Sequence, residues 1–271
     1  MKLIRKVKAI FRILYREYSW YQDARFCRKT MSSKLIQEVP KGKKIVLMPH
    51  SDDEWIGCSQ ILLHQPEQIL VVNMDMSGGD SGQLHRIRRN EAELVAEKYG
   101  YRFITVQDRL KDLVRILVDE QPVCVFLPCY LDWHEEHIIV MELFQKAATQ
   151  VGYTGMVGMY QVSLPIPEKM INSGLEMNKG QLREKWKCVG EMYKTQAFLP
   201  TKRFMFNEYI NGGITDTFAV EAYSIYEFQN WDVEWKQLLL TSEEKKKCID
   251  HLQEIKYIRL MLQSRALDKK G

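Results

Sequence analysis

Several features that would assign this chain to a familiar class are missing from its sequence. The cysteines form no C-x-x-C pair and are scattered along the chain, at Cys27, Cys58, Cys124, Cys129, Cys188 and Cys248. No apolar run is long enough to span a bilayer, and internal repeats and low-complexity tracts are absent. The glycine-rich stretch of residues 77–82 has neither the G-x-G-x-x-G pattern nor a P-loop lysine, so it is no nucleotide-binding fingerprint. We interpret it as a flexible loop lining a substrate site, with a plain turn as the alternative.

What is present is the composition of an ordinary globular protein. The 271 residues are 45% hydrophobic and 27% charged, which is enough for a sizeable core in one large domain with or without appendages. Without a good signal peptide, the separated cysteines are expected to be reduced thiols of a cytoplasmic protein.

Positive charge is concentrated at the N-terminus. Residues 1–45 hold 13 Lys/Arg against 3 Asp/Glu, although the whole chain carries a net charge of only +4. Apolar residues recur at helical spacing over residues 3–18, but Arg12 and Arg16 interrupt them, so the stretch is neither a membrane span nor a good signal sequence. Two interpretations stay open: a basic amphipathic helix on an anionic membrane surface, or a helix packed on the domain with a solvated basic face. No nucleic-acid-reading motif accompanies the charge, and we expect no nucleic-acid partner.

From residue 43 onward, strand-like and helix-like stretches alternate. Strands are predicted at residues 45–48, 68–74, 102–106, 123–127 and 156–162, with a late strand at 214–221. Helices are predicted at residues 57–64, 84–99, 108–119, 135–150 and 181–195. This alternation predicts an α/β fold, a Rossmann-like, mostly parallel sheet with helices on both faces, and helical appendages at both ends of the chain.

Histidines and carboxylates follow two of the predicted strands. His50, Asp52 and Asp53 come just after residues 45–48, and His134 and His137 come just after residues 123–127. The carboxyl ends of parallel strands share one edge of a sheet, where ligands bind. Imidazole and carboxylate together suit Zn²⁺, and three protein ligands leave an open position, as in catalytic zinc sites.

Three blocks of the sequence resemble the LmbE / PIG-L family of zinc-dependent N-deacetylases. Pro49-His50-Ser51-Asp52-Asp53-Glu54 is similar to the family's Pro/Ala-His-Pro-Asp-Asp-Glu motif, with serine in place of the second proline. Arg88-Arg89-Asn90-Glu91 resembles its Arg-x-x-Glu, and residues 132–137, DWHEEH, resemble its Asp-x-His-x-Asp-His. The blocks occur in the family's order, and the resemblance covers roughly residues 43 to 230.

The resemblance implies a role for each matching residue. His50, Asp53 and His137 would bind Zn²⁺, Asp52 would be the general base, and His134 would assist catalysis. Arg88, on the following helix, would face the substrate. Trp133, beside His134, would either stack on a sugar ring or pack in the protein.

These expectations combine into one functional hypothesis. Residues 1–40 would form a basic helical arm, residues 41–230 the deacetylase domain, and residues 231–271 a C-terminal helical extension. The enzyme would remove the acetyl group from an N-acetylglucosamine-type sugar in the cytoplasm, with the arm able to contact the inner face of the membrane. The alternatives are an amidase for another acylated amine, such as a thiol-glycoside conjugate, and a non-catalytic sugar-binding protein on the same fold.

Overall fold

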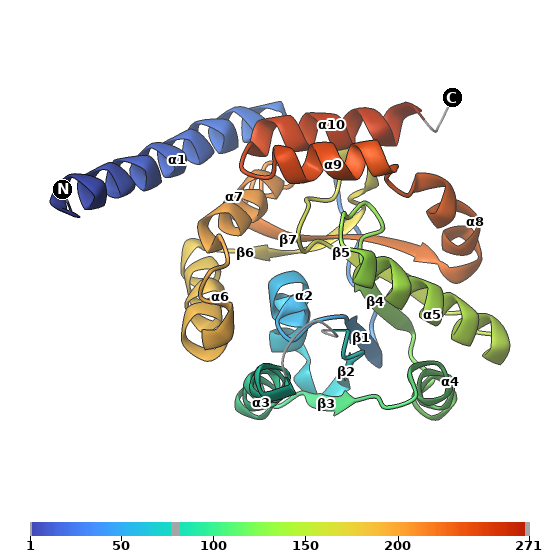
Figure 1. Ribbon diagram of the computed structural model, residues 1–271. Helices are drawn as coiled ribbons and strands as arrows, with labels where there is room; N and C mark the ends of the chain where they lie inside the picture. Colours follow the sequence, from blue (N-terminus) through green and yellow to red (C-terminus); the bar gives the residue numbers. More distant parts are fainter. Residues whose placement is uncertain (1, 77–81, 269–271) are drawn as a thin grey trace.

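The computed structural model describes residues 2–76 and 82–268, and the side chains within them except those of residues 2–7, 9, 10, 267 and 268. In these ranges the chain forms a seven-stranded sheet in the order β3-β2-β1-β4-β5-β7-β6 (Figure 1). The strands are β1 (Lys44–Met48), β2 (Ile69–Asn73), β3 (Arg102–Thr105), β4 (Cys124–Pro128), β5 (Met156–Tyr160), β6 (Ser173–Met177) and β7 (Ala219–Glu227). Residues 77–81 of the predicted glycine-rich loop lie outside the described part of the chain.

The first five strands are parallel to one another, and β7 runs antiparallel to both β5 and β6. The predicted Rossmann-like, mostly parallel sheet is therefore confirmed. The late strand predicted at residues 214–221 is wrong in its bounds, because residues 212–217 form a turn closed by the Thr217 N–H donating to the Gly212 carbonyl at 3.0 Å. Ile214 lies in that turn, and its side chain is buried in the core, which accounts for the apolar residue there. Strand β6 was not predicted, since its sequence SGLEM is short and only partly buried.

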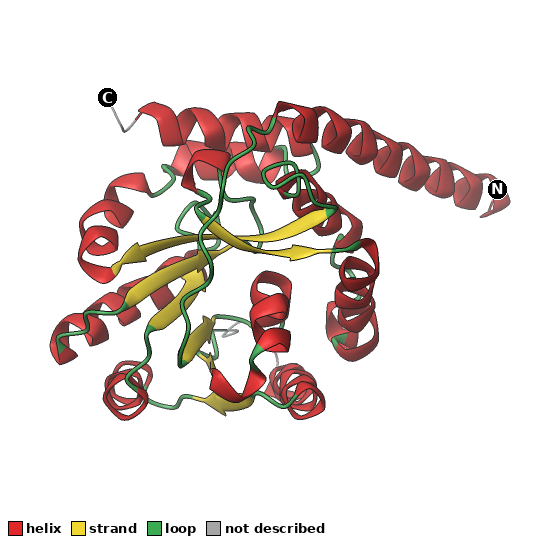
Figure 2. Cartoon of the chain, turned by 180° about the vertical axis from the view of Figure 1, so that it is seen from behind, coloured by secondary structure: helices red, strands yellow, loops and turns green. Residues whose placement is uncertain are grey.

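Helices cover both faces of the sheet (Figure 2). They are α1 (Lys2–Thr30), α2 (Asp53–His64), α3 (Gly82–Tyr99), α4 (Arg109–Glu120), α5 (Glu135–Val151), α6 (Lys179–Met192), α7 (Thr201–Asn211), α8 (Phe228–Leu238), α9 (Ser242–Asp250) and α10 (Ile255–Asp268). One face packs against α4, α5, α8 and α10, and the other against α2, α3 and α6. Strands β1, β2 and β4 are buried along their whole length, as expected of parallel strands covered on both sides.

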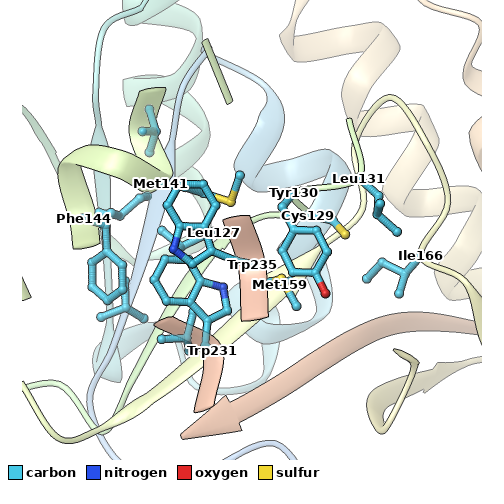
Figure 3. Close-up of a cluster of buried hydrophobic side chains, with 14 of the residues drawn as sticks. Leu127, Cys129, Tyr130, Leu131, Met141, Phe144, Met159, Ile166, Trp231 and Trp235 are labelled. Carbon is cyan, nitrogen blue, oxygen red and sulfur yellow. The ribbon is translucent and has the colours of Figure 1, made fainter. Parts of the chain in front are cut away.

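Aromatic residues of α8 fill the core beside α5 (Figure 3). Trp231 and Trp235 stack with ring centroids 5.5 Å apart, and Trp231 meets Phe144 of α5 edge-on at 5.7 Å. Burying rings of this size contributes a large share of core stability. The C-terminal helices thus share the core of the sheet.

Helix α1 divides into a packed half and a projecting half (Figure 1). Trp20, Ala24 and Cys27 are buried against α7 and α10, and the Trp20 indole N–H donates to the Gln253 carbonyl at 2.7 Å. In the other half, Phe11 and Tyr15 are 68% and 76% exposed. In the described part of the chain, no helix combines the length and the apolar character needed to cross a bilayer.

The topology brings the two histidine segments together. Strands β1 and β4 are parallel neighbours in the sheet, with Val46 opposite Phe126. The loops that follow them therefore leave the same edge side by side. The first of these loops carries His50, and the second carries Asp132 and leads into α5.

Candidate metal centre

The first part of the site is the turn between β1 and α2. Asp53 is the first residue of α2, where a carboxylate is stabilised by the positive end of the helix dipole. Its Oδ2 accepts a hydrogen bond from the His50 backbone N–H at 2.9 Å and lies 3.2 Å from His50 Nδ1. The helix start and the histidine are thus fixed to each other.

The second part is the start of α5. His134 is the N-cap residue of this helix, and His137 lies in its first turn. Asp132 holds both of them: its Oδ1 accepts from the His134 backbone N–H at 3.1 Å, and its Oδ2 lies 3.0 Å from His137 Nδ1. Asp132 is almost completely buried, so these contacts are shielded from water.

Together the two parts form a group that could hold a metal ion. One ligand atom each from His50, Asp53 and His137 can be chosen so that all lie within 4.8 Å of one another. His137 Nε2 is buried, has no hydrogen-bond partner among the described residues and lies 3.6 Å from Asp53 Oδ2, while Nδ1 of the same ring is held by Asp132. A histidine held at one nitrogen by a carboxylate and free at the other is typical of metal ligation. The three residues fit Zn²⁺, which takes two histidines and a carboxylate in catalytic sites.

The electrostatics of the group favour a cation. Burial alone would lower the pKa of His137, but the carboxylates of Asp132 and Asp53 outweigh it and raise the pKa to about 10. Asp53 is also buried, yet the neighbouring charge of His137 holds the pKa of its carboxyl below the ordinary value. A metal ion would supply the positive charge that these carboxylates stabilise.

Asp52 stands beside this group without joining it. Its backbone φ of 151° lies in a region that L-residues rarely adopt, at a cost of about 1–3 kcal/mol. Burial raises the pKa of Asp52 well above its ordinary value, and the carboxylates of Asp53 and Glu54 raise it further. The positive charge of Arg88 acts in the opposite direction, which places Arg88 within electrostatic range of Asp52. The carboxyl of Asp52 therefore has the environment of a proton acceptor and donor.

His134 lies on the other side of the group, partly open to solvent. Its ring centroid is 4.9 Å from that of His137 and 5.7 Å from that of His50. Burial lowers the pKa of His134, which makes the neutral imidazole the main form at neutral pH. The Trp133 ring stacks on His134, with ring centroids 3.7 Å apart.

Helix α3 contributes Arg88 and Glu91, which sequence spacing alone would pair on its surface. Instead, Glu91 is buried and accepts two hydrogen bonds from Thr195, one from its backbone N–H at 3.1 Å and one from its hydroxyl. Arg88 is half-buried and lies on the same helix, one turn before Glu91.

Three supporting residues received no definite role from the sequence. Asp132 belongs to the motif of residues 132–137, and its spacing from His134 and His137 is the only sequence signal that could have indicated a role at the site. From the sequence, Glu54 could equally face solvent, but in the structure it is fully buried. Tyr193, from the end of α6, donates its hydroxyl hydrogen to Glu54, and nothing local in the sequence indicates this contact across 139 residues.

Known structures share this fold. The N,N'-diacetylchitobiose deacetylase of Pyrococcus horikoshii, complexed with its inhibitor MPG, is 20% identical with a TM-score of 0.53, over 70% of this chain and 85% of that chain. The conserved protein TT1542 of Thermus thermophilus is 16% identical with a TM-score of 0.54, over 68% and 94% of the two chains. The A40926 pseudoaglycone deacetylase Dbv21 is 13% identical with a TM-score of 0.52, over 70% and 99%.

These likenesses confirm the fold expected from the sequence. A scan of protein-family models gives no match to this chain. A search of the curated proteins gives no match either.

Proposed function

We propose that the protein is a zinc-dependent N-deacetylase that acts on an N-acetylglucosamine-type sugar. The observation that carries the proposal is the group of His50, Asp53 and His137, in which the buried His137 Nε2 lies 3.6 Å from Asp53 Oδ2 and Asp52 lies alongside. The shared fold supports it, since two of the similar structures are described as deacetylases, one of them for a diacetylated amino sugar.

The proposed chemistry is hydrolysis of an acetamide. A Zn²⁺ held by His50, Asp53 and His137 would act as a Lewis acid toward the amide carbonyl and would acidify a water. Asp52 would accept the proton of the attacking water, since a carboxylate whose pKa is raised is a stronger base. Water oxygen adds to the carbonyl carbon, the C–N bond breaks, and the products are acetate and a free amine.

The remaining steps need a hydrogen-bond donor and a proton for the leaving group. The neutral His134 imidazole can donate one hydrogen bond to the negative charge that develops on the carbonyl oxygen. The leaving amine would take the proton that Asp52 accepted from the water. Arg88 lies on α3, and its charge acts on Asp52. We propose that Arg88 binds hydroxyl or anionic groups of the substrate.

The direct test is acetate release from a panel of N-acetylglucosamine glycosides and lipids, after chelation and after Zn²⁺ is added back. We expect release that the chelator abolishes and zinc restores. Release only from other acylated amines would favour the amidase alternative. Failure to release acetate from any acylated amine, with sugar binding retained, would contradict the proposal and favour the non-catalytic alternative.

We further propose that the projecting half of α1 contacts an anionic membrane surface, in a protein that works in the cytoplasm. Phe11, Leu14, Tyr15 and Tyr18 are exposed and recur at helical spacing, so they lie along one side of the helix. Lysines and arginines surround them, and repulsion between like charges disfavours pairing with a second copy of the helix. An apolar stripe with basic flanks is typical of helices that lie in a membrane interface.

Vesicle sedimentation tests this contact on the full chain. Phosphatidylserine-containing vesicles are expected to bind the wild-type protein, and the variant Phe11→Ser/Tyr15→Ser is expected to bind them much more weakly. Val233→Ser, at an apolar position that is 68% exposed on α8, is the matched control and should bind normally. Equal binding by all three proteins would contradict the role of α1.

A further inference from the structure

A buried chain of hydrogen bonds connects the end of α6 to the backbone of Asp52. The Tyr193 hydroxyl donates to Glu54 Oε1 at 2.5 Å, and Glu54 Oε2 accepts from the Asp52 backbone N–H at 3.2 Å. Tyr193 and Glu54 are fully buried. The chain therefore reaches the residue with the unusual φ from the interior of the protein, on the side away from solvent.

The backbone at Asp52 needs such a support. Its carbonyl is already fixed, because it accepts from the N–H groups of Trp55 and Ile56 at 3.1 and 2.9 Å in the first turn of α2. The Glu54 contact fixes the N–H of the same residue. With both peptide groups of Asp52 held, the strained φ persists, as it does where the surroundings over-determine a conformation.

A carboxylate at position 54 is costly for stability alone. Glu54 is fully buried, so its carboxyl loses its hydration and has the Tyr193 hydroxyl and the Asp52 N–H as hydrogen-bond donors instead. An apolar side chain would fill the same space at lower cost in free energy. Its presence is explained if the carboxylate has a positioning role.

The segment that carries Tyr193 is itself anchored. Thr195, two residues later, is held by both oxygens of Glu91 on α3. Tyr193 is thus fixed relative to the helix that carries Arg88, and the chain of contacts ties the positions of Arg88 and Asp52 to each other.

We propose that Tyr193 and Glu54 are positioning residues, which aim the Asp52 carboxyl at the substrate by holding its strained backbone. This inference rests on the proposed deacetylase function for its kinetic test, but its structural test does not depend on turnover.

The kinetic test compares Tyr193→Phe and Glu54→Met with the wild type, because methionine is of similar length and has no oxygen to accept from the Asp52 N–H. Each is expected to lower kcat on the order of tenfold, since a misplacement of about 1 Å can cost 10²-fold, while KM and zinc content stay unchanged. In an Asp52→Asn background, Tyr193→Phe should have no further effect on the residual rate, because the two changes act on the same group. Tyr153→Phe is the matched control; it removes a tyrosine hydroxyl that donates to the Met156 carbonyl at 2.8 Å, and it should leave kcat unchanged.

The results separate this inference from the proposed function. If the wild-type protein releases acetate and Tyr193→Phe has an equal kcat, the positioning role alone is overturned. The same holds if Tyr193→Phe lowers kcat as much in the Asp52→Asn background as in the wild type. If Tyr193→Phe does not fold, Glu54→Met, which keeps the side-chain length but cannot accept from the Asp52 N–H, serves in both comparisons.

A crystal structure of either variant tests the same idea without any turnover. In Glu54→Met we expect the Asp52 N–H to lose its hydrogen bond to residue 54, and in both variants we expect φ of Asp52 to leave its unusual value. An Asp52 backbone that is unchanged in both variants would overturn the inference, whatever the substrate.

Discussion

Asp52 and Asp53 are neighbouring buried carboxylic acids with opposite pKa shifts. Burial and nearby carboxylates raise the pKa of Asp52, whereas His137 outweighs the effect of burial on Asp53 and holds its pKa below the ordinary range. Pairs of acids whose environments separate their pKa values in this way mark a division of roles at a site. Here Asp53 is suited to stay ionised toward a cation and Asp52 to exchange a proton.

At the residue scale we predict the effect of Asp52→Asn. The amide keeps the size of the side chain but cannot accept a proton, so kcat should fall by a factor of about 10² or more. Zinc content, measured by atomic absorption, should match the wild type because Asp52 is outside the group of candidate ligands. Turnover equal to that of the wild type would remove Asp52 from the mechanism.

At the element scale, a buried polar network joins α6 and α7 to β7. Lys185 of α6 is 1% exposed, and its Nζ contacts Glu208 of α7 and Glu221 of β7. The same Nζ donates to the Ile56 carbonyl at 2.7 Å, just before the kink of α2 at Cys58. One lysine therefore links the helix that begins at Asp53 to three other elements.

Lys185→Met is expected to destabilise the protein strongly. Removing the lysine leaves two buried carboxylates without their counter-charge, which typically costs about 3–5 kcal/mol in the free energy of unfolding. The measurement is urea denaturation followed by circular dichroism.

The control is on the same helix. Lys187 has a side chain that is 55% exposed, and it makes surface ion pairs with Glu184 and Glu191. Lys187→Met should change the free energy of unfolding by no more than about 0.5 kcal/mol. Similar values for the two variants would mean that the buried network contributes little.

At the scale of the whole molecule, the candidate metal site joins two segments that are far apart in the chain. His50 and Asp53 follow β1, and His137 lies on α5 beyond β4. A metal that binds only the folded chain stabilises it by mass action, by about 2.7 kcal/mol when the metal is at a hundred times its Kd.

Added Zn²⁺ is therefore expected to raise Tm by roughly 5 °C, and a chelator should reverse the change. His137→Ala should abolish this increase, because it removes a candidate ligand. His134→Ala should keep it, because His134 is not one of the three residues. Differential scanning calorimetry measures the Tm of each variant with and without Zn²⁺. An equal loss of the zinc-dependent increase in Tm in the two variants would overturn the ligand assignment.

The sequence by itself determined the sheet class and the segments that carry the site. Apolar runs followed by His and Asp residues predicted that the site lies at the carboxyl ends of β1 and β4. This was possible because periodicity and composition are local properties of a chain. It did not reveal β6, because a short edge strand has little apolar pattern, or the antiparallel direction of β7, because strand pairing is long-range.

The tertiary structure alone decided what supports the site. The contacts of Tyr193 with Glu54, and of Lys185 with Glu208 and Glu221, join residues that are distant in the chain. Polar residues of this kind are usually exposed, and only the packing of α6 against α2 and β7 shows that they are buried. The unusual φ of Asp52 is likewise imposed by its surroundings, because no local preference of aspartate favours it.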